Sequence, residues 1–360
     1  DPKSKQWILR ISRGNSRFYY YSDQFEEFAK NWEENTWFIL NTFTRRILSY
    51  GFDTKEEAEK ELESIARQKD ESTTPTTKRK TKKVYKYDPI DDINRKGNDL
   101  LHNGHITTDQ FMKKFDFRGG QFGNWVSENE RQENLDQAYG ALMDLANVLN
   151  IAPESIAFQK NLSIAFGARG TGGFAAAPAH YEPLRKVINL TKYKGAGTLA
   201  HEWAHALDHY LWYTIQDTED THLASETIHV SNLIRTFLPE FKKLLDALKY
   251  TDDYHYTEFY TGSNEFDKVF RKGEHGYWTS ATEMFARAFD CYVSDKLKEA
   301  EIYSPYLTSH ANSYVYESEN GTVYYAYPIG EERTRINQCF DQLFDTLKSK
   351  IILWEGNCHA

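Results

Sequence analysis

The pentad His201-Glu202-Trp203-Ala204-His205 constrains the fold of this chain more than any other segment. Residues four apart in a helix project from the same face, so two imidazoles at this spacing can bind one metal ion. Glu202 then lies beside the ion, where a general base for a metal-bound water is needed. The pattern predicts a helix, and it requires a second segment that supplies a third ligand.

The flanking residues favour this helix. Thr198 is a candidate N-cap, and residues 199–211 contain neither Pro nor Gly. The apolar positions that would pack around the polar seam are Leu199, Trp203, Ala206, Leu207, Tyr210 and Leu211. The alternative is that two ordinary histidines occur at this spacing by chance on a partly exposed helix. The helical context makes this alternative the weaker one.

Composition excludes several classes of protein. The chain has 360 residues, of which 40% are hydrophobic and 27% are charged, as in globular proteins. A net charge of -9 argues against a molecule that binds nucleic acid over its whole surface. No stretch is long and apolar enough to cross a bilayer. The cysteines (Cys291, Cys339 and Cys358) fit neither a disulfide framework nor a zinc finger, which favours a reducing compartment.

Three segments are expected along the chain, and the fold class is α+β. Residues 1–70 read as a small α+β docking or binding module, with strand-like runs at 7–11, 17–21 and 37–43 and helices at 23–33 and 53–66. Residues 71–87 read as a basic flexible linker, and residues 88–354 as one larger domain. The lysine-rich stretch from Lys78 to Lys86 has two interpretations, a solvated linker or a weak contact with nucleic acid or an acidic partner, and the linker is preferred. Because the chain begins at Asp1, a fragment or processed piece of a longer protein is expected.

The larger domain contains one long helix and two strand-like runs. Residues 131–149 carry an apolar stripe at helical spacing, and residues 162–166 and 186–190 read as strands. The glycine-rich residues 167–173 lack the Lys-Ser/Thr ending of a P-loop and are interpreted as a turn or flap near the cleft. The second strand, with Ile188, Asn189 and Leu190, is predicted to be a sheet edge that pairs with an extended peptide substrate.

A third metal ligand is best sought at Glu283. Residues 279–289 read as a helix that Thr279 or Ser280 caps, with apolar residues on one face. A surface glutamate paired with Arg287 is the alternative, and spacing alone does not decide between the two. His209 lies one further helical turn from His205, too far along the axis to share the same ion.

Several blocks of sequence carry a family resemblance. His201–Asp208 and Glu283–Phe289 resemble the gluzincin metallopeptidases, including the lethal-factor-like group. More closely, the region from about Phe115 to Leu347 resembles the first of the large polyvalent protein-associated domains. The blocks that carry this second likeness are residues 117–125, 165–170, 179–183, 187–191 and 327–333. The first seventy residues are not covered.

The resemblance implies a zincin-like metallopeptidase domain from a phage or conjugative element, acting in the cytoplasm of a bacterial host cell and against its defences. It also implies that His201, His205 and Glu283 hold one zinc ion. Some gluzincins place an Asp four residues after the ligand Glu to orient a histidine, but Arg287 stands there. Asp208 is the candidate for that orienting role, and Arg287 is also expected to act on the ligands from the next layer of residues.

The sequence therefore predicts a zinc-dependent endopeptidase. Glu202 removes a proton from the metal-activated water and passes it to the leaving amine. Tyr277 is the candidate donor to the developing negative charge, and the alternative is an aromatic packing residue. A competing hypothesis is a catalytically silent binding module of a DNA-transfer protein, against which the intact Glu202 speaks. A nuclease is disfavoured because no carboxylate cluster for paired magnesium ions is present.

Overall fold

The computed structural model divides the chain into two compact units, Asp1–Thr81 and Lys82–Ala360. In the first unit it describes residues 9–13, 37–41, 47–52, 54, 56, 57 and 59–61. In the second it describes 84, 85 and 94–356, except 103, 124–127, 168–178, 191–195, 230, 271–275, 310, 312–314, 319 and 355. Both helices and sheets are present, so the predicted α+β class is confirmed. The boundary between the units falls within the stretch interpreted as a linker.

The first unit contains an antiparallel sheet with the strand order β1-β2-β3. Its strands are β1 (Leu9–Arg13), β2 (Trp37–Asn41) and β3 (Ile47–Phe52). The first two overlap the runs expected at 7–11 and 37–43, whereas β3 was not predicted. Gly51 interrupts the strand-like sequence pattern of β3. The strand is instead identified by its antiparallel pairing with β2. The expected strand at 17–21 and helix at 23–33 lie outside the described residues.

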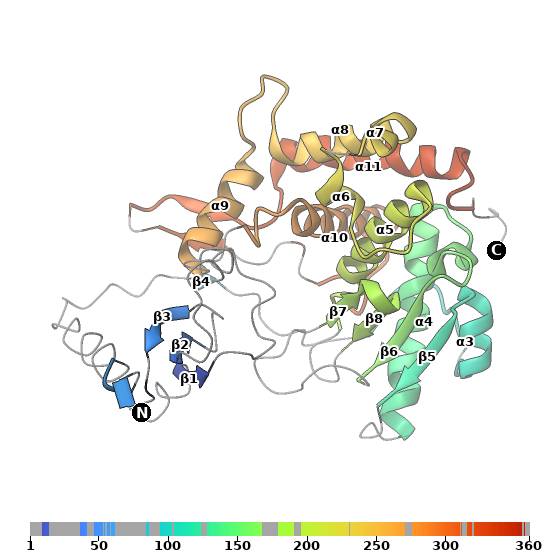
Figure 1. The fold of residues 1–360 in the computed structure, drawn as a ribbon. Coiled ribbons are helices and arrows are strands. Elements are labelled where there is room, and N and C mark those ends of the chain that lie inside the picture. The colour runs from blue at the N-terminus through green and yellow to red at the C-terminus, as the bar shows by residue number, and fades with distance from the viewer. Residues whose placement is uncertain are drawn as a thin grey trace. The chain divides into compact units, whose positions relative to one another are not determined.

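The second unit combines two small sheets with a set of helices (Figure 1). The strands are β4 (Val84–Tyr85), β5 (Gly119–Phe122), β6 (Ser163–Phe166), β7 (Ala179–Glu182), β8 (Val187–Leu190), β9 (Val315–Glu317) and β10 (Val323–Tyr325). The first helices are α3 (Thr108–Phe115), α4 (Glu128–Leu149), α5 (Leu199–Gln216), α6 (Ala224–Thr227) and α7 (Asn232–Phe237). They are followed by α8 (Pro239–Lys249), α9 (Glu258–Phe270), α10 (Ala281–Glu299) and α11 (Gly330–Ser349), and short 3-10 turns are η3 (Pro153–Ala157) and η4 (Pro183–Arg185). The helices predicted at 131–149, 199–211 and 279–289 are confirmed as α4, α5 and α10.

The larger sheet corrects one prediction about substrate binding. Its order is β5-β6-β8-β7, with β5, β6 and β8 parallel and β7 antiparallel to β8. Strand β8 is therefore an interior strand, hydrogen-bonded on both sides, and Ile188, Asn189 and Leu190 are at most 2% exposed. The prediction that these residues form a sheet edge and pair with a peptide is wrong. The run Val-Ile-Asn-Leu is nearly all apolar because both of its faces are buried.

The hydrophobic core fixes α5 and α10 against each other, and Figure 1 shows them side by side. Trp203 on α5 is fully buried, with its ring centroid 5.5 Å from that of Phe289 on α10. Its indole nitrogen donates to the carbonyl of Ile156 at 2.9 Å, which ties α5 to η3. The apolar side of the pentad helix thus packs inward and sets the direction of the two histidines. Within the part of the chain that the structure describes, no helix meets the length and apolarity that a membrane span requires.

Helix α9 approaches strand β10 at Gly262 without an intervening side chain. A Cβ atom at this glycine would lie 2.2 Å from the carbonyl oxygen of Tyr325, which is too close for any other residue. The same region is joined to α10 by the guanidinium of Arg287. The contact between α9 and β10 is therefore held by close backbone packing at Gly262 and by hydrogen bonds from Arg287.

Candidate metal centre

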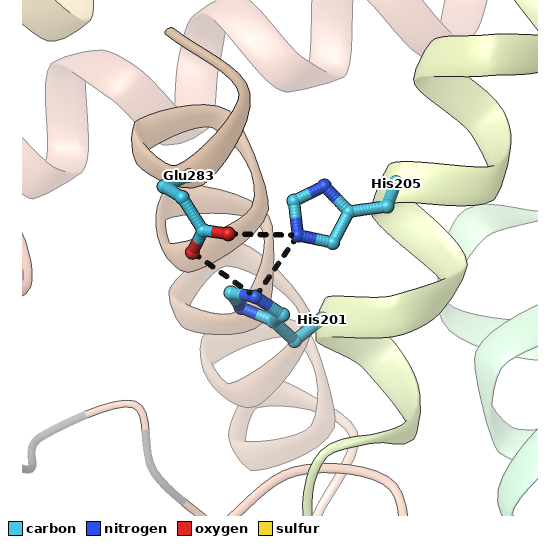
Figure 2. A group of neighbouring side chains, drawn as sticks. All are labelled: His201, His205 and Glu283. Atoms are coloured by element: carbon cyan, nitrogen blue, oxygen red, sulfur yellow. Dashed lines mark hydrogen bonds and ion pairs between the residues drawn. The ribbon is translucent and has the colours of Figure 1, made fainter. Parts of the chain in front are cut away.

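The structure brings together the three residues that the sequence predicted as metal ligands. His201 and His205 project from α5, and Glu283 projects toward them from the first turn of α10 (Figure 2). The two Nε2 atoms are 3.1 Å apart. Oε2 of Glu283 lies 3.5 Å from Nε2 of His201, and Oε1 lies 3.5 Å from Nε2 of His205. Spacing left open whether Glu283 is a metal ligand or a surface glutamate paired with Arg287. The geometry favours the ligand, because the carboxylate faces the histidines rather than Arg287.

The two 3.5 Å separations suit a tetrahedral divalent ion, and the 3.1 Å between the imidazole nitrogens is slightly shorter than the ideal range. Bonds of about 2.0–2.2 Å at tetrahedral angles place two ligand atoms roughly 3.3–3.6 Å apart. Two imidazoles and one carboxylate are also the donor set of many zinc sites that keep a fourth position open. The three side chains are 18%, 13% and 15% exposed, so the cluster is reachable from solvent at its edge.

The start of α10 is positioned by capping and by one buried carboxylate. Ser280 is the N-cap, and its hydroxyl accepts a hydrogen bond from the backbone N–H of Glu283 at 3.3 Å. Asp267 on α9 accepts from the backbone N–H groups of Trp278 and Thr279 at 2.8 and 3.0 Å. The cap therefore fixes the residue that bears the ligand, and Asp267 fixes the segment that bears the cap. Of the two caps predicted, Ser280 is the one observed.

The start of α5 is held in a way that the sequence did not indicate. Thr198 precedes the helix, but its side chain makes no capping hydrogen bond, so this prediction is wrong. Instead, the backbone N–H of Ala200 donates to the carbonyl of Leu307 at 3.0 Å. The N–H of Gly197 donates to the carbonyl of Tyr306 at 2.8 Å. A backbone segment from far along the chain satisfies N–H groups that a cap would otherwise satisfy.

The pKa values of His205 and Glu283 are strongly shifted in opposite directions. Burial by itself raises the pKa of Glu283, but hydrogen bonds and positive charge from the two histidines hold that pKa well below its usual range. Burial by itself lowers the pKa of His205, but the hydrogen bond and charge of Glu283 outweigh this and raise it to about 9. The negative charge of Glu202 acts in the same direction. Without a bound cation, the site therefore favours a proton on His205.

Glu202 is the residue predicted to act as a base beside the ion. It is buried, with 7% of its surface exposed, on the α5 turn between the two histidines. Its negative charge contributes to the raised pKa of His205, so the carboxylate lies within electrostatic reach of the ligands. A buried carboxylate is costly to maintain unless a partner offsets it, and a cation at the cluster would be that partner.

Asp208 contacts a neighbour other than the one predicted. Its two carboxylate oxygens accept from the backbone N–H of Ser225, at 2.8 Å, and from the Ser225 hydroxyl. Burial raises the pKa of Asp208 to about 7, although the bonds from Ser225 and the charge of His205 lower it. The side chain thus anchors α6 to α5, and it acts on His205 through charge rather than through the predicted orienting hydrogen bond.

Arg287 supports the backbone around the ligand helix. The residue is 2% exposed, and its guanidinium donates to the carbonyls of Trp278 and Ala326 and to the Ser263 hydroxyl. Nε also donates to the carbonyl of Glu283, at 3.2 Å. Arg287, four residues after Glu283, therefore supports the main chain by hydrogen bonds and does not orient a histidine.

Replacing Arg287 with alanine is expected to destabilise the fold by roughly 2 kcal/mol or more. Each buried carbonyl left without a donor costs about 1–3 kcal/mol, and Trp278 and Ala326 would both lose theirs. Arg287→Lys should not restore stability, since one ammonium cannot span the divergent acceptors. The free energy of unfolding in urea measures both effects. Arg185→Ala, whose side chain is 61% exposed, is the control, and equal stability of the two alanine variants would contradict the role.

The remaining predicted site residues fall in different places. Tyr277 precedes the cap of α10, is 37% exposed and packs edge-on against Trp278. Its catalytic role stays a prediction.

His209 does not face the cluster, because its Nδ1 accepts from the Tyr181 hydroxyl at 2.8 Å and its Nε2 donates to the carbonyl of Asp220 at 3.0 Å. The structure thus places His209 outside the cluster, with both ring nitrogens bonded to other groups.

Asp290 was missed by sequence reasoning. It lies on α10 seven residues after Glu283, on the same face of the helix, and it is 1% exposed. Burial raises its pKa to about 6, although the charge of His201 lowers it. Its Oδ1 has no hydrogen-bond partner among the described residues. The seven-residue spacing was readable in the sequence, but only packing against α5 distinguishes this carboxylate from a surface one.

Comparison with known families gives one match. Residues 269–351 match the model of large polyvalent protein-associated domain 1. The family resemblance inferred from the sequence is confirmed for this part of the chain, which is narrower than the region from Phe115 to Leu347 in which it was expected. The match includes Glu283 but not the two histidines of α5. No curated protein and no solved structure was found to match.

Proposed function

We propose that this chain, which carries large polyvalent protein-associated domain 1 over residues 269–351, is a zinc-dependent endopeptidase with a zincin-like catalytic domain. The observation that carries the proposal is the His201–His205–Glu283 cluster, whose donor atoms have separations suited to a tetrahedral ion. The buried Glu202 beside it adds the one group that a purely structural site would not need. The donor set fits zinc better than magnesium or calcium, which prefer oxygen ligands.

Each of the four residues has a defined part in the mechanism. His201, His205 and Glu283 would hold the ion. A bound zinc ion would polarise the scissile carbonyl and lower the pKa of a water molecule. Glu202 accepts the proton from the attacking water and delivers it to the departing amine nitrogen, so one carboxylate serves first as base and then as acid. Tyr277 remains the candidate donor to the oxygen on which negative charge develops.

An extended substrate is expected to bind along β7 rather than β8. Among the described strands, β7 pairs only with β8, so its other side is an edge where a peptide can add by backbone hydrogen bonds. This strand is tied to the ligand helix, because the Tyr181 hydroxyl bonds His209, one turn after His205. Binding through the backbone would orient many sequences in the same way.

Consistent with the domain match, we expect a mobile genetic element as the source and a bacterial host cell as the setting.

The direct test is digestion of denatured protein by the zinc-loaded full chain. New peptide termini should appear, and a chelator should stop their formation until zinc is restored. Zinc binding without any cleavage would favour the binding module over the peptidase.

Zinc binding at pH 7 is expected to release about one proton. His205 carries a proton below its pKa of about 9, and a metal ligand needs the lone pair of that nitrogen. Apparent affinity should therefore rise about tenfold per pH unit up to about pH 9 and then level off. Titration calorimetry in two buffers of different ionisation enthalpy measures the release. A release of zero at pH 7 would contradict the coupling between His205 and Glu283.

A further inference from the structure

A cavity of about 440 Å³ lies at the start of the parallel strands β5, β6 and β8. Gly119, Ser163 and Val187 are the first residues of these strands, lie side by side in register, and all line the cavity. The volume falls within the roughly 300–1,000 Å³ of pockets that bind small molecules. The cavity is therefore large enough to hold a small ligand.

This cavity is separate from the metal centre. No residue of α5 or α10 is among its described lining residues. Ile188 and its register partner Tyr181 face α5, where the Tyr181 hydroxyl bonds His209. Val187 lines the cavity and is the neighbour of Ile188 in the strand, so its side chain points to the opposite face of the sheet. A ligand in the cavity would therefore lie across the sheet from the helix that carries the two histidines.

Arg118, which directly precedes β5, supplies a positive charge to the cavity. Its Nε donates to the Ser163 hydroxyl at 3.2 Å, and its Nη2 donates to the backbone carbonyl of Arg185. Neither acceptor carries a charge, so these bonds orient the guanidinium without neutralising it. A guanidinium that is already held in place loses little freedom when it binds an anion.

A second guanidinium and two neutral polar side chains line the same cavity. Arg185 donates from Nη1 to Glu182 at 2.9 Å. Glu182 thus offsets the charge of Arg185, and among the described residues the charge of Arg118 is left for a ligand. Gln121 adds an amide, and the Ser163 hydroxyl, which accepts from Arg118, can donate its own proton. The cavity therefore combines net positive charge with hydrogen-bond donors.

We propose that this cavity binds the phosphate group of a small polar molecule, such as a sugar phosphate. A phosphate monoester carries a charge of about -1.5 to -2 at pH 7 and three acceptor oxygens, which suits two guanidinium groups and a hydroxyl donor from adjacent strands. A carboxylate offers only two oxygens in one plane and less charge. The inference goes beyond the proposed peptidase function and does not depend on it.

Titration calorimetry of the full chain with glucose 6-phosphate tests the inference, with glucose as the uncharged counterpart. Glucose 6-phosphate should bind saturably, and glucose should not bind. Arg118→Gln should weaken the binding about 10–100-fold, since it removes a charged hydrogen-bond donor. Lys160→Gln is the matched control, because it also removes one positive charge, from a side chain that is 72% exposed and does not line the cavity. Its affinity should equal that of the wild type.

A second titration separates the cavity from the metal centre, because phosphate groups also bind metal ions. The zinc-loaded chain and the chain freed of zinc should bind glucose 6-phosphate with the same affinity, since no ligand of the proposed ion lines the cavity. Binding that requires zinc would place the phosphate at the metal centre and would overturn the inference.

Other outcomes would also contradict a phosphate site. Equal affinity of Arg118→Gln and the wild type would exclude Arg118 as a ligand-binding residue, and an absence of saturable binding would exclude the site altogether. Malate, which carries carboxylates only, should bind more weakly than glucose 6-phosphate, and the reverse order would exclude phosphate as the preferred group. If Arg118→Gln fails to fold, Arg185→Ala replaces it and should also weaken the binding.

Discussion

Replacing Glu202 with glutamine is expected to abolish nearly all peptide hydrolysis while zinc stays bound. Glutamine keeps the shape and buried volume of glutamate but cannot accept a proton from water. The loss of a positioned general base lowers rates by about 10²–10⁴-fold. Because Glu202 is not one of the three residues of the ligand cluster, the zinc content of the variant should equal that of the wild type.

The measurement compares cleavage rates of one peptide at matched zinc content. Glu133→Gln, an exposed glutamate on α4, is the control and should cleave at the wild-type rate. Equal rates for Glu202→Gln and the wild type would remove Glu202 from the mechanism. A loss of zinc in Glu202→Gln would instead mean that its carboxylate contributes to metal binding.

The second large effect is expected from His205→Ala, which should lower the zinc content from about one ion per chain to almost none. The variant removes one of three donors and leaves the other two, which is too few for tight binding of zinc. It should also lose the stabilisation that zinc gives the wild type. That stabilisation is about 2.7 kcal/mol when free zinc is a hundred times its Kd.

Metal analysis after gel filtration and thermal melts with and without zinc measure the two effects. His222→Ala is the matched control, because its side chain is 56% exposed and pairs with Asp220 away from the cluster. The control should keep both the ion and the thermal shift. One zinc ion retained by His205→Ala would show that the metal is bound elsewhere, and the proposed mechanism would then fail.

Local patterns were sufficient for several parts of the site. The spacing of His201 and His205 predicts two imidazoles on one helical face, and the cap signal at Ser280 predicts where α10 begins. Both are properties of a few neighbouring residues, so the sequence contains the whole signal. The resemblance of separate blocks then indicated which distant glutamate belongs with them.

Other features depend on which elements meet. Sequence reasoning made β8 an edge strand, but an apolar run does not reveal how many neighbours a strand has. Arg287 and Asp208 were both expected to act on the ligands, because they stand at suitable distances along their helices. Their partners instead come from remote residues such as Ala326 and Ser225.

What the sequence determined by itself is the chemistry available: two imidazoles at a helical spacing, a carboxylate between them and a family likeness that points to Glu283. What only the tertiary structure decided is that these groups meet, with Glu283 at 3.5 Å from both imidazoles. The physical reason is that periodicity and capping act over a few residues. Packing of α5 against α10, strand order and cavity shape arise instead from contacts between segments far apart in the chain.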